Sequence, residues 1–427
     1  MNDNRRNFLK IGSLAGLGLA SGSVLAACQT KTEGGATTAA TTATAAQQVG
    51  SQIFNMSGYK APKLDKVRIA FVGLGMRGPH AVQRMSYIEG VEIKALCDIR
   101  PKQIDNVLKT LEGTTHKPDL YSDGPDAWKE MFDRDDIDLV YIATPWDLHT
   151  PMAVYGMEAG KHVAVEVPAA KTIDECWQLV ETSERTKKHC MMLENCCYDF
   201  FELLTLNMVR NGLLGELVHA EGAYIHDLRD LNFSKKGYAD MWRLKENIGR
   251  NGNLYPTHGL GPIAQCLDIN RGDRMDHLVG MSTNDFMMGE MAKQLAANDD
   301  FYKPFEGAKY RGNMHTTLIK TFKGKTIMLQ HDVTTPRPYS RIHLLSGTKG
   351  IARKWPSPQK IAFGHGWIKQ EEYKELEEKY TLPIVKHVGE IARKIGGHGG
   401  MDFIMDWRLI DCLRNGLPLD QDVYDAA

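Results

Sequence analysis

Short apolar runs alternate with segments of helical spacing from Lys66 to about Asn195. The runs are mostly apolar, as strands buried on both faces of a parallel sheet are, and cover residues 67–72, 91–97, 139–143, 162–165 and 190–193. Between them, spacing and end signals predict helices near residues 79–88, 101–111, 126–132, 150–160 and 172–188. This alternation predicts an α/β domain with a doubly wound parallel sheet.

The rhythm changes after Asn195. A helix expected over residues 201–210 is followed by longer strands, expected at 217–224, 314–322, 326–333 and 341–345, and by a last helix at 401–414. The stretch Phe322-Lys323-Gly324-Lys325 predicts a hairpin turn. We therefore expect a second, α+β domain with an open, mostly antiparallel sheet and helices on one face.

The first 64 residues lack such a pattern. NRRNFLK carries Arg5 and Arg6, an apolar stretch covers Ile11 to Val24, and LAAC ends at Cys28. We predict a twin-arginine lipoprotein signal peptide over residues 1–27 with lipidation at Cys28; a plain cleaved signal with an incidental cysteine is the alternative. Residues 28–64, rich in Thr and Ala, are predicted to be a tether. The protein is then exported to the periplasm or cell envelope, with its only membrane attachment at Cys28.

The charge balance and the cysteine spacing limit the kinds of molecule that the protein is expected to bind. The chain has 52 Lys and Arg against 53 Asp and Glu, which argues against a nucleic-acid surface and for a small-molecule partner. Its eight cysteines include no CxxC pair, so no metal site is predicted. The exposed face of an open sheet indicates a homo-oligomer.

A dinucleotide site is predicted at the end of the first strand. There the chain reads GLGMRG, from Gly73 through Gly75 to Gly78, before a helix, and Asp98 follows the next strand 20 residues after Gly78. The glycines permit a tight turn and close approach of a pyrophosphate, and the acid can bind the ribose hydroxyl groups. Asp98 favours NAD over NADP, although Arg100 nearby could accommodate a 2′-phosphate. The alternative is a structural glycine turn without a cofactor.

The stretches AFVGLGMRG, ALCDI, ATPWDLH and AVEVPAA resemble the Gfo/Idh/MocA dehydrogenases. The resemblance covers the chain from Lys66 onward and implies a Rossmann domain, residues 65–195, followed by a substrate-binding domain, residues 196–427. It implies that NAD is lined by Gly73, Gly75, Met76, Arg77, Gly78, Asp98, Trp146, Asp147, Leu148, His149, Glu166, Val167, Asn195 and Tyr255.

Two motifs depart from a dehydrogenase. Most members of that family carry Glu-Lys-Pro where this chain has Glu166-Val167-Pro168, and an Asp near the position of Tyr255, before His258. EVPAA, HDLRD, MWR, NGNLYPTHGLGP and TTPRPYSR together resemble one branch, the NAD-dependent α-N-acetylgalactosaminidases of glycoside hydrolase family 109. This resemblance implies a sugar pocket lined by Tyr224, Arg243, Tyr255, Pro256, Thr257, His258 and Tyr339.

Such an enzyme oxidises the sugar at C3, removes the C2 proton, eliminates the leaving group, adds water and returns the hydride. NAD is then tightly bound and regenerated in every turnover, and the substrate is a glycan or glycoside with a terminal N-acetylhexosamine. We assign His258 to the C3 hydroxyl proton, with Tyr255 beside it, and Tyr224 to the C2 proton; these roles could be permuted. An exported NAD(P)-dependent sugar oxidoreductase and a non-catalytic NAD- and sugar-binding sensor are the alternatives.

Overall fold

The computed structural model describes residues 52–427. The predicted signal peptide, the lipidation at Cys28 and most of the tether therefore lie outside the described residues. Within the described part of the chain, no helix has the length and apolar character needed to cross a membrane. The seven cysteines found there are all free thiols.

The first half of the described chain forms a six-stranded parallel sheet, in the order β3-β2-β1-β4-β5-β6. Its strands are β1 (Val67–Val72), β2 (Val91–Cys97), β3 (Asp119–Tyr121), β4 (Leu139–Ile142), β5 (His162–Val165) and β6 (Cys190–Met192). Residues of β4 and β5 are buried throughout, as the apolar runs predict. The strand order is that of a Rossmann fold, so the predicted α/β class is confirmed.

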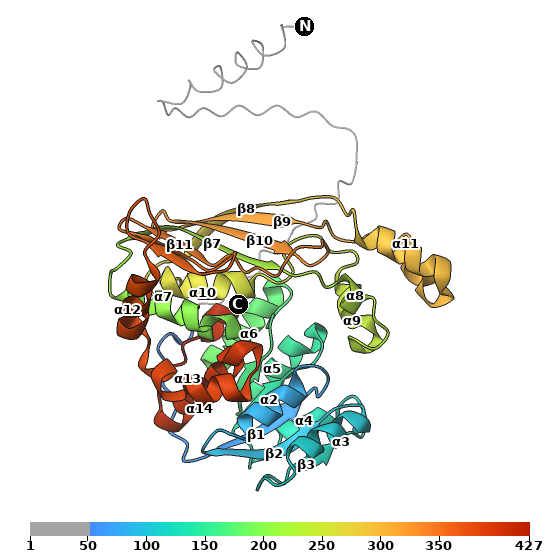
Figure 1. Cartoon of the computed structure of the whole chain (residues 1–427). Coiled ribbons are helices and arrows are strands. Elements are labelled where there is room, and N and C mark those ends of the chain that lie inside the picture. Colours follow the sequence, from blue (N-terminus) through green and yellow to red (C-terminus); the bar gives the residue numbers. More distant parts are fainter. Residues whose placement is uncertain (1–51) are drawn as a thin grey trace, which may run out of the picture. The chain divides into compact units, whose positions relative to one another are not determined.

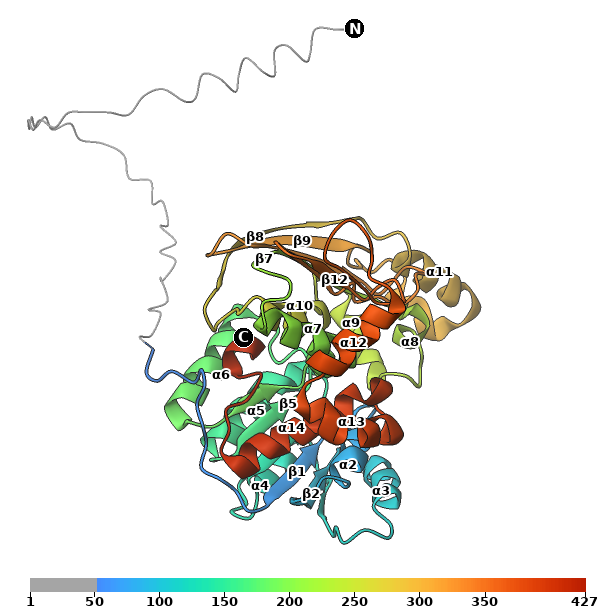
Figure 2. The ribbon, with the colours of Figure 1, turned by 60° about the vertical axis from the view of Figure 1, so that its left-hand side comes forward.

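Helices cover both faces of this sheet (Figures 1 and 2). One face carries α2 (Gly78–Met85), α3 (Pro101–Thr110), α13 (Pro383–Ile395) and α14 (Met401–Asn415), and the other carries α4 (Ala127–Phe132), α5 (His149–Glu158), α6 (Ile173–Thr186) and α15 (Val423–Ala426). Helix α6 begins as its sequence predicts, because Thr172 and Glu175 form a capping box. The last helices of the chain thus complete the core of the first sheet, and the predicted domain boundary at residue 195 stays a prediction.

The second sheet has seven strands in the order β13-β12-β11-β7-β10-β9-β8. They are β7 (Leu217–Ile225), β8 (Met275–Ser282), β9 (His315–Thr321), β10 (Thr326–Asp332), β11 (Leu344–Gly347), β12 (Ile351–Arg353) and β13 (Lys360–Ala362). Only β7 and β10 pair in parallel, and β9 and β10 form the predicted hairpin. The sheet is therefore mostly antiparallel, as predicted.

One face of this sheet is covered by helices, namely α7 (Phe200–Arg210), α10 (Thr257–Cys266) and α12 (Gln370–Tyr380), which lie beneath it in Figure 1. The outer face and the edge strand β8 expose Leu278, Val279, Met281 and Leu318, and the turn between β9 and β10 exposes Phe322. Smaller elements extend from the sheet: α8 (Arg229–Asn232), α9 (Trp242–Glu246) and α11 (Met288–Asn298). The 3₁₀ helices are η1 (Trp146–Leu148), η2 (Asn195–Tyr198), η3 (Ala239–Met241), η4 (Asp300–Phe305) and η5 (His398–Gly400).

The strand predicted over residues 341–345 begins too early. In the structure β11 starts at Leu344, because Ile342 and His343 adopt positive φ angles of 62° and 42°, which no strand allows. The irregular backbone lets the Arg341 side chain turn inward to Asp199 and Glu202, at 2.5 and 2.8 Å. The segment predicted to begin the strand therefore carries a buried ion pair instead, and the strand starts three residues later.

Candidate active site

The glycine-rich turn joins β1 to α2 and is packed as tightly as a dinucleotide turn requires. Gly73 has a φ of 87°, and a Cβ placed on it would lie 2.6 Å from the main chain of Ala143. A Cβ on Gly78 would lie 2.1 Å from the carbonyl oxygen of Gly73, so only glycine lets α2 start this close to the turn. The surface over Gly75 is open apart from Arg100, 3.5 Å from such a Cβ. These residues fit a bound pyrophosphate.

Asp98 lies directly after β2, where the adenosine ribose is expected. Its Oδ2 accepts the N–H of Leu74 at 2.7 Å, which ties the acid to the glycine-rich turn, and its Oδ1 accepts the N–H of Arg100 at 2.9 Å. The Arg100 Nε also lies 3.3 Å from Oδ1. Asp98 thus holds the guanidinium of Arg100 in an ion pair, which favours the NAD prediction over NADP.

Two of the predicted cofactor residues, Asn195 and Arg77, meet at the carboxylate of Asp402, which was not among the residues selected from the sequence. The Asp402 side chain, at the start of α14, accepts hydrogen bonds from Asn195 Nδ2 at 2.5 Å and Arg77 Nη1 at 3.2 Å. Arg77 Nε also donates to Glu166 at 3.1 Å. Burial would raise the pKa of Asp402, but His398, Arg77 and Arg84 hold this pKa well below its usual value. Asp402 is therefore a buried negative charge that holds the predicted cofactor residues Arg77 and Asn195 together.

The segment after β4 divides its four predicted cofactor residues between two environments. Trp146 is buried and packs against Trp242 and Tyr255, whereas Leu148 is exposed. Asp147 pairs with Lys171, whose Nζ also binds Glu246 of α9 at 2.8 Å. His149 is buried, with Nδ1 and Nε2 each 2.8 Å from a carbonyl oxygen, of Pro168 and Thr144. His149 thus ties together the segments that follow β4 and β5.

The predicted sugar-binding rings gather into one cluster. The ring of Tyr224, at the end of β7, lies 5.0 Å from both Tyr255 and His258, and 6.3 Å from Tyr339. Tyr255 and His258 lie 4.8 Å apart with perpendicular rings. These residues come from β7, the loop before α10, α10 itself and the loop before β11. The fold therefore brings together three segments that are distant in sequence, around residues 224, 255–258 and 339.

Arg243 and Trp146 connect this ring cluster to the cofactor side. Tyr255 stacks on Trp146, with ring centres 5.7 Å apart and planes at 25°. The Arg243 guanidinium lies 5.1 Å from the centres of both rings, within cation–π range. Pro256 and Thr257 lie where α10 starts and place His258 in its first turn.

The tyrosines of the cluster are all protonated at neutral pH. Burial, opposed by the charge of Arg243, raises the pKa of Tyr224 to about 12. Burial also raises the pKa of Tyr255 well above its usual value, and it raises the pKa of Tyr339 in the same way. A tyrosine that removes a proton here must pass its own proton to a neighbour.

His258 has a buried partner that sequence reasoning missed. Its Nδ1 lies 2.8 and 3.0 Å from the two carboxylate oxygens of Glu194, which follows β6 and is fully buried. Burial would raise the pKa of Glu194, but the charge and hydrogen bond of His258 lower this pKa instead. Glu194 accepts the Nδ1 hydrogen bond in both forms of His258, so the neutral imidazole keeps its proton at Nδ1 and has Nε2 free to accept another.

Glu194, Cys196 and His258 form the one grouping in residues 52–427 whose ligand atoms lie close enough to hold a metal ion. The Glu194 carboxylate is already occupied by His258 and by the N–H of Cys196 at 3.0 Å. Burial also raises the pKa of the Cys196 thiol well above its usual value, so the thiolate that binds metals is disfavoured. These donors fit a hydrogen-bonded pair better than a metal.

Two further histidines border the site and were not selected from the sequence. His226 lies beside Tyr224 and Tyr339, with its ring 5.2 Å from that of Tyr339. His398 has a side chain 55% exposed and places Nδ1 2.9 Å from Asp402 and 3.3 Å from Arg77. The available signals were the HDLRD motif and the GGHGG stretch, in which all four glycines have positive φ.

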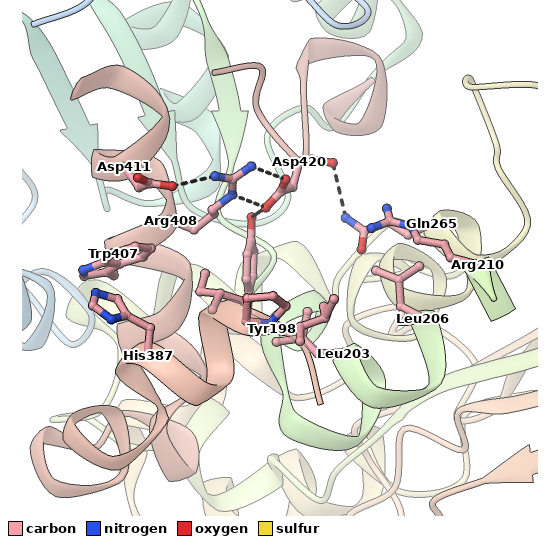
Figure 3. A pocket seen from close by; sticks show the side chains of 13 residues that line it. Tyr198, Leu203, Leu206, Arg210, Gln265, His387, Trp407, Arg408, Asp411 and Asp420 are labelled. Carbon is pink, nitrogen blue, oxygen red and sulfur yellow. Dashed lines mark hydrogen bonds and ion pairs between the residues drawn. The ribbon is translucent and has the colours of Figure 1, made fainter. Parts of the chain in front are cut away.

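A separate cavity of about 420 Å³ lies between α7, α13 and α14 (Figure 3). Its wall contains Trp407 and His387, and Arg408 is held there by ion pairs to Asp411 and Asp420. None of the predicted site residues lines it. The cluster of rings, rather than this cavity, is the candidate active site.

Two families match adjoining parts of the chain. Residues 67–194 match the oxidoreductase family with an NAD-binding Rossmann fold, and residues 198–427 match the C-terminal domain of glycosyl hydrolase 109. The chain is 53% identical over 378 residues to an alpha-N-acetylgalactosaminidase of Bacteroides fragilis, which covers 87% of this chain and 88% of the relative. It is 49% identical to glycosyl hydrolase family 109 protein 1 of Bacteroides thetaiotaomicron, over 86% and 80% of the two chains.

Solved structures with this fold include dehydrogenases. A levoglucosan dehydrogenase in complex with NADH and levoglucosan superposes with a TM-score of 0.63 at 18% identity, over 84% of this chain and 93% of the other. A myo-inositol dehydrogenase from Lactobacillus casei, in complex with NAD(H) and myo-inositol, has a TM-score of 0.56 at 13% identity, over 84% and 90%. At these identities the likeness shows the fold alone.

Proposed function

The chain belongs to glycosyl hydrolase family 109, and from this membership we propose that it removes terminal α-linked N-acetylgalactosamine from glycans by an NAD-dependent redox cycle. Its cofactor is NAD. The observation that carries the proposal is the position of the Tyr224, Tyr255 and His258 rings, which lie within 5.0 Å of one another. Tyr255 also stacks on Trp146, one of the predicted cofactor residues. A sugar held by these rings meets proton-handling groups where a conventional glycosidase has two carboxylates.

The glycine-rich turn, Asp98 and the residues around Asp402 would hold NAD, which would supply a reversible hydride acceptor for C3 of the sugar. His258 accepts the proton of the C3 hydroxyl group at Nε2, because Glu194 holds its other ring nitrogen. Val167, where the dehydrogenases carry lysine, is buried and apolar, so it moves no proton. The Glu194–His258 pair takes over this task.

The remaining steps need residues on other sides of the sugar. Tyr224 faces the C2 proton, and Arg243 and Tyr339 orient the sugar. His398 is our candidate for assisting the leaving group, because its half-exposed ring lies at the edge of the site, beside Arg77 and Asp402. Its glycine-rich turn gives the backbone the freedom to bring the ring toward a substrate.

The proposal is tested by hydrolysing a nitrophenyl α-N-acetylgalactosaminide in D₂O with the purified holoenzyme and no added cofactor. We expect release of nitrophenol, no net NADH and deuterium at C2 of the free sugar. Hydrolysis without deuterium at C2 would contradict the elimination mechanism. Consumption of NAD in proportion to product would indicate an oxidoreductase, and binding of NAD and sugar without turnover would indicate a sensor.

We also propose that two copies associate through the outer face of the second sheet. Strand β8 is an edge strand, and Val279 and Met281 on it are 63% and 78% exposed. Edge strands with exposed apolar side chains are stabilised by a partner surface. Analytical ultracentrifugation of the wild type and of Met281→Asp tests this, since a monomeric wild type would contradict it.

The predicted export motif has a physical rationale in this function. An enzyme outside the cytoplasm cannot rely on a supply of NAD, so we propose that it folds around the cofactor before export by the twin-arginine route. It then acts as a periplasmic or cell-envelope lipoprotein anchored at Cys28. Replacing Arg5 and Arg6 with lysine should retain NAD-loaded enzyme inside the cell, which fractionation measures; normal export of this variant would contradict the proposal.

A further inference from the structure

His226 is placed to work with Tyr224. Tyr224 lies in β7 and His226 follows the end of this strand, where its main-chain N–H still pairs with Asp332, so the two side chains leave the chain on the same side. The Tyr224 hydroxyl lies 3.3 Å from Nδ1 of His226. The main-chain N–H of His226 donates to Asp332 at 2.9 Å, and the ring of Tyr339 packs perpendicular to the imidazole at 5.2 Å. Backbone and ring contacts therefore hold the imidazole against the tyrosine.

The chemistry of Tyr224 requires such a neighbour. Its buried hydroxyl keeps its proton at neutral pH, since burial raises its pKa to about 12. Burial also lowers the pKa of His226, and the nearby charges of Arg243, His258 and His398 add to this effect against the opposing charge of Asp227. The imidazole is thus neutral, and a neutral imidazole can accept a proton at one ring nitrogen.

We propose that His226 is the proton relay partner of Tyr224, accepting the phenolic proton at Nδ1 while Tyr224 Oη takes the proton from C2 of the sugar. This proposal rests on the proposed function. His226 acts through Tyr224 and positions its hydroxyl group.

The step balances once C3 of the bound sugar is a ketone. The C2–H bond breaks, its electron pair becomes the second bond between C1 and C2, and the C1–O bond breaks with its pair leaving on the departing oxygen. The C2 proton is then on Tyr224 and the former phenolic proton is on His226. Because His226 is only partly buried, its protons exchange with solvent. The Tyr224 hydroxyl proton exchanges in turn with His226 across their hydrogen bond, so that the transfer from Tyr224 after water addition delivers a solvent proton to C2.

The test uses His226→Gln in the NAD-loaded enzyme, with N-acetylgalactosamine as the probe in D₂O. Glutamine retains a hydrogen bond to Tyr224 but accepts no proton. We expect deuteration at C2, followed by mass spectrometry, to slow by at least about a hundredfold, a typical contribution of general base catalysis. Formation of enzyme-bound reduced nicotinamide, followed by its near-ultraviolet absorbance, should stay near wild type because it precedes C2 deprotonation.

His219→Gln is the matched control, because His219 lies on the strand that carries Tyr224 and binds Thr326 at 2.8 Å, away from the ring cluster. It should leave both signals unchanged. If His226→Gln deuterates the sugar at the wild-type rate, or loses both signals in parallel, the relay is overturned. His226→Asn repeats the test if the first variant has a lower melting temperature. A wild type that shows neither signal would instead contradict the proposed function itself.

Discussion

Replacing His258 with asparagine is expected to reduce kcat by about 10²–10⁴-fold, the range for loss of a general acid–base group. His258 contacts the rings of Tyr224 and Tyr255 and has one ring nitrogen free for the C3 hydroxyl. The NAD content of the purified variant should equal that of the wild type, because none of the contacts of Asp98 or Asp402 is altered. Steady-state hydrolysis of a nitrophenyl glycoside and cofactor release by denaturation measure the two quantities.

Glu194→Gln is the companion variant. Glutamine fills the same buried space but carries no charge to stabilise a protonated His258, so we expect a loss of kcat smaller than that of His258→Asn, with KM little changed. The double variant should resemble His258→Asn alone, since both residues act in one step. If His258→Asn retained most of the wild-type kcat, the C3 proton would have to be assigned to Tyr255.

Replacing Gly78 with alanine is expected to destabilise the protein and to deplete it of NAD. The added Cβ would lie 2.1 Å from the carbonyl oxygen of Gly73, so the turn and α2 must separate. Overpacking of this kind costs about 1–3 kcal/mol, which the shift of the urea midpoint measures. The cofactor bound per chain should fall as well, because the turn predicted to hold the pyrophosphate is displaced.

Gly75→Ala separates the two effects. A Cβ at this position meets only the flexible guanidinium of Arg100, at 3.5 Å, so the variant should fold with near wild-type stability. It should nevertheless hold less NAD, since the second glycine of such a turn allows close approach of the pyrophosphate. A Gly75→Ala protein that retained full NAD would place the pyrophosphate away from this residue.

Five of the six strands of the first sheet could be predicted closely from sequence because their signals are local, whereas the short strand β3 was missed because its residues are mostly exposed. Strand β1 begins and ends as expected, since a short apolar run meets Gly73 directly. Strand β8 was missed because it is an exposed edge strand whose residues carry no burial pattern. The start of β11 was wrong because a long-range ion pair of Arg341, rather than local propensity, sets the backbone there.

Some residues of the candidate site could likewise be predicted from local motifs, and others could not. Arg243, Tyr255, His258 and Tyr339 lie in motifs of the resemblance, Tyr224 lies two residues before one of them, and the fold brings all five together. Glu194 was missed because it meets His258 across 64 residues of chain, and Asp402 because its partners Arg77 and Asn195 lie on other elements. No local spacing could reveal contacts that only tertiary packing creates.

The position of Asp402 has a consequence for biosynthesis. Its carboxylate joins Arg77 and Asn195 in the cofactor site, and its helix α14 fills the core beneath β1 and α2. A nascent chain in which all strands of the parallel sheet have been synthesised still lacks Asp402. Because Arg77 and Asn195 are predicted cofactor residues, we expect firm binding of NAD only after α14 has left the ribosome.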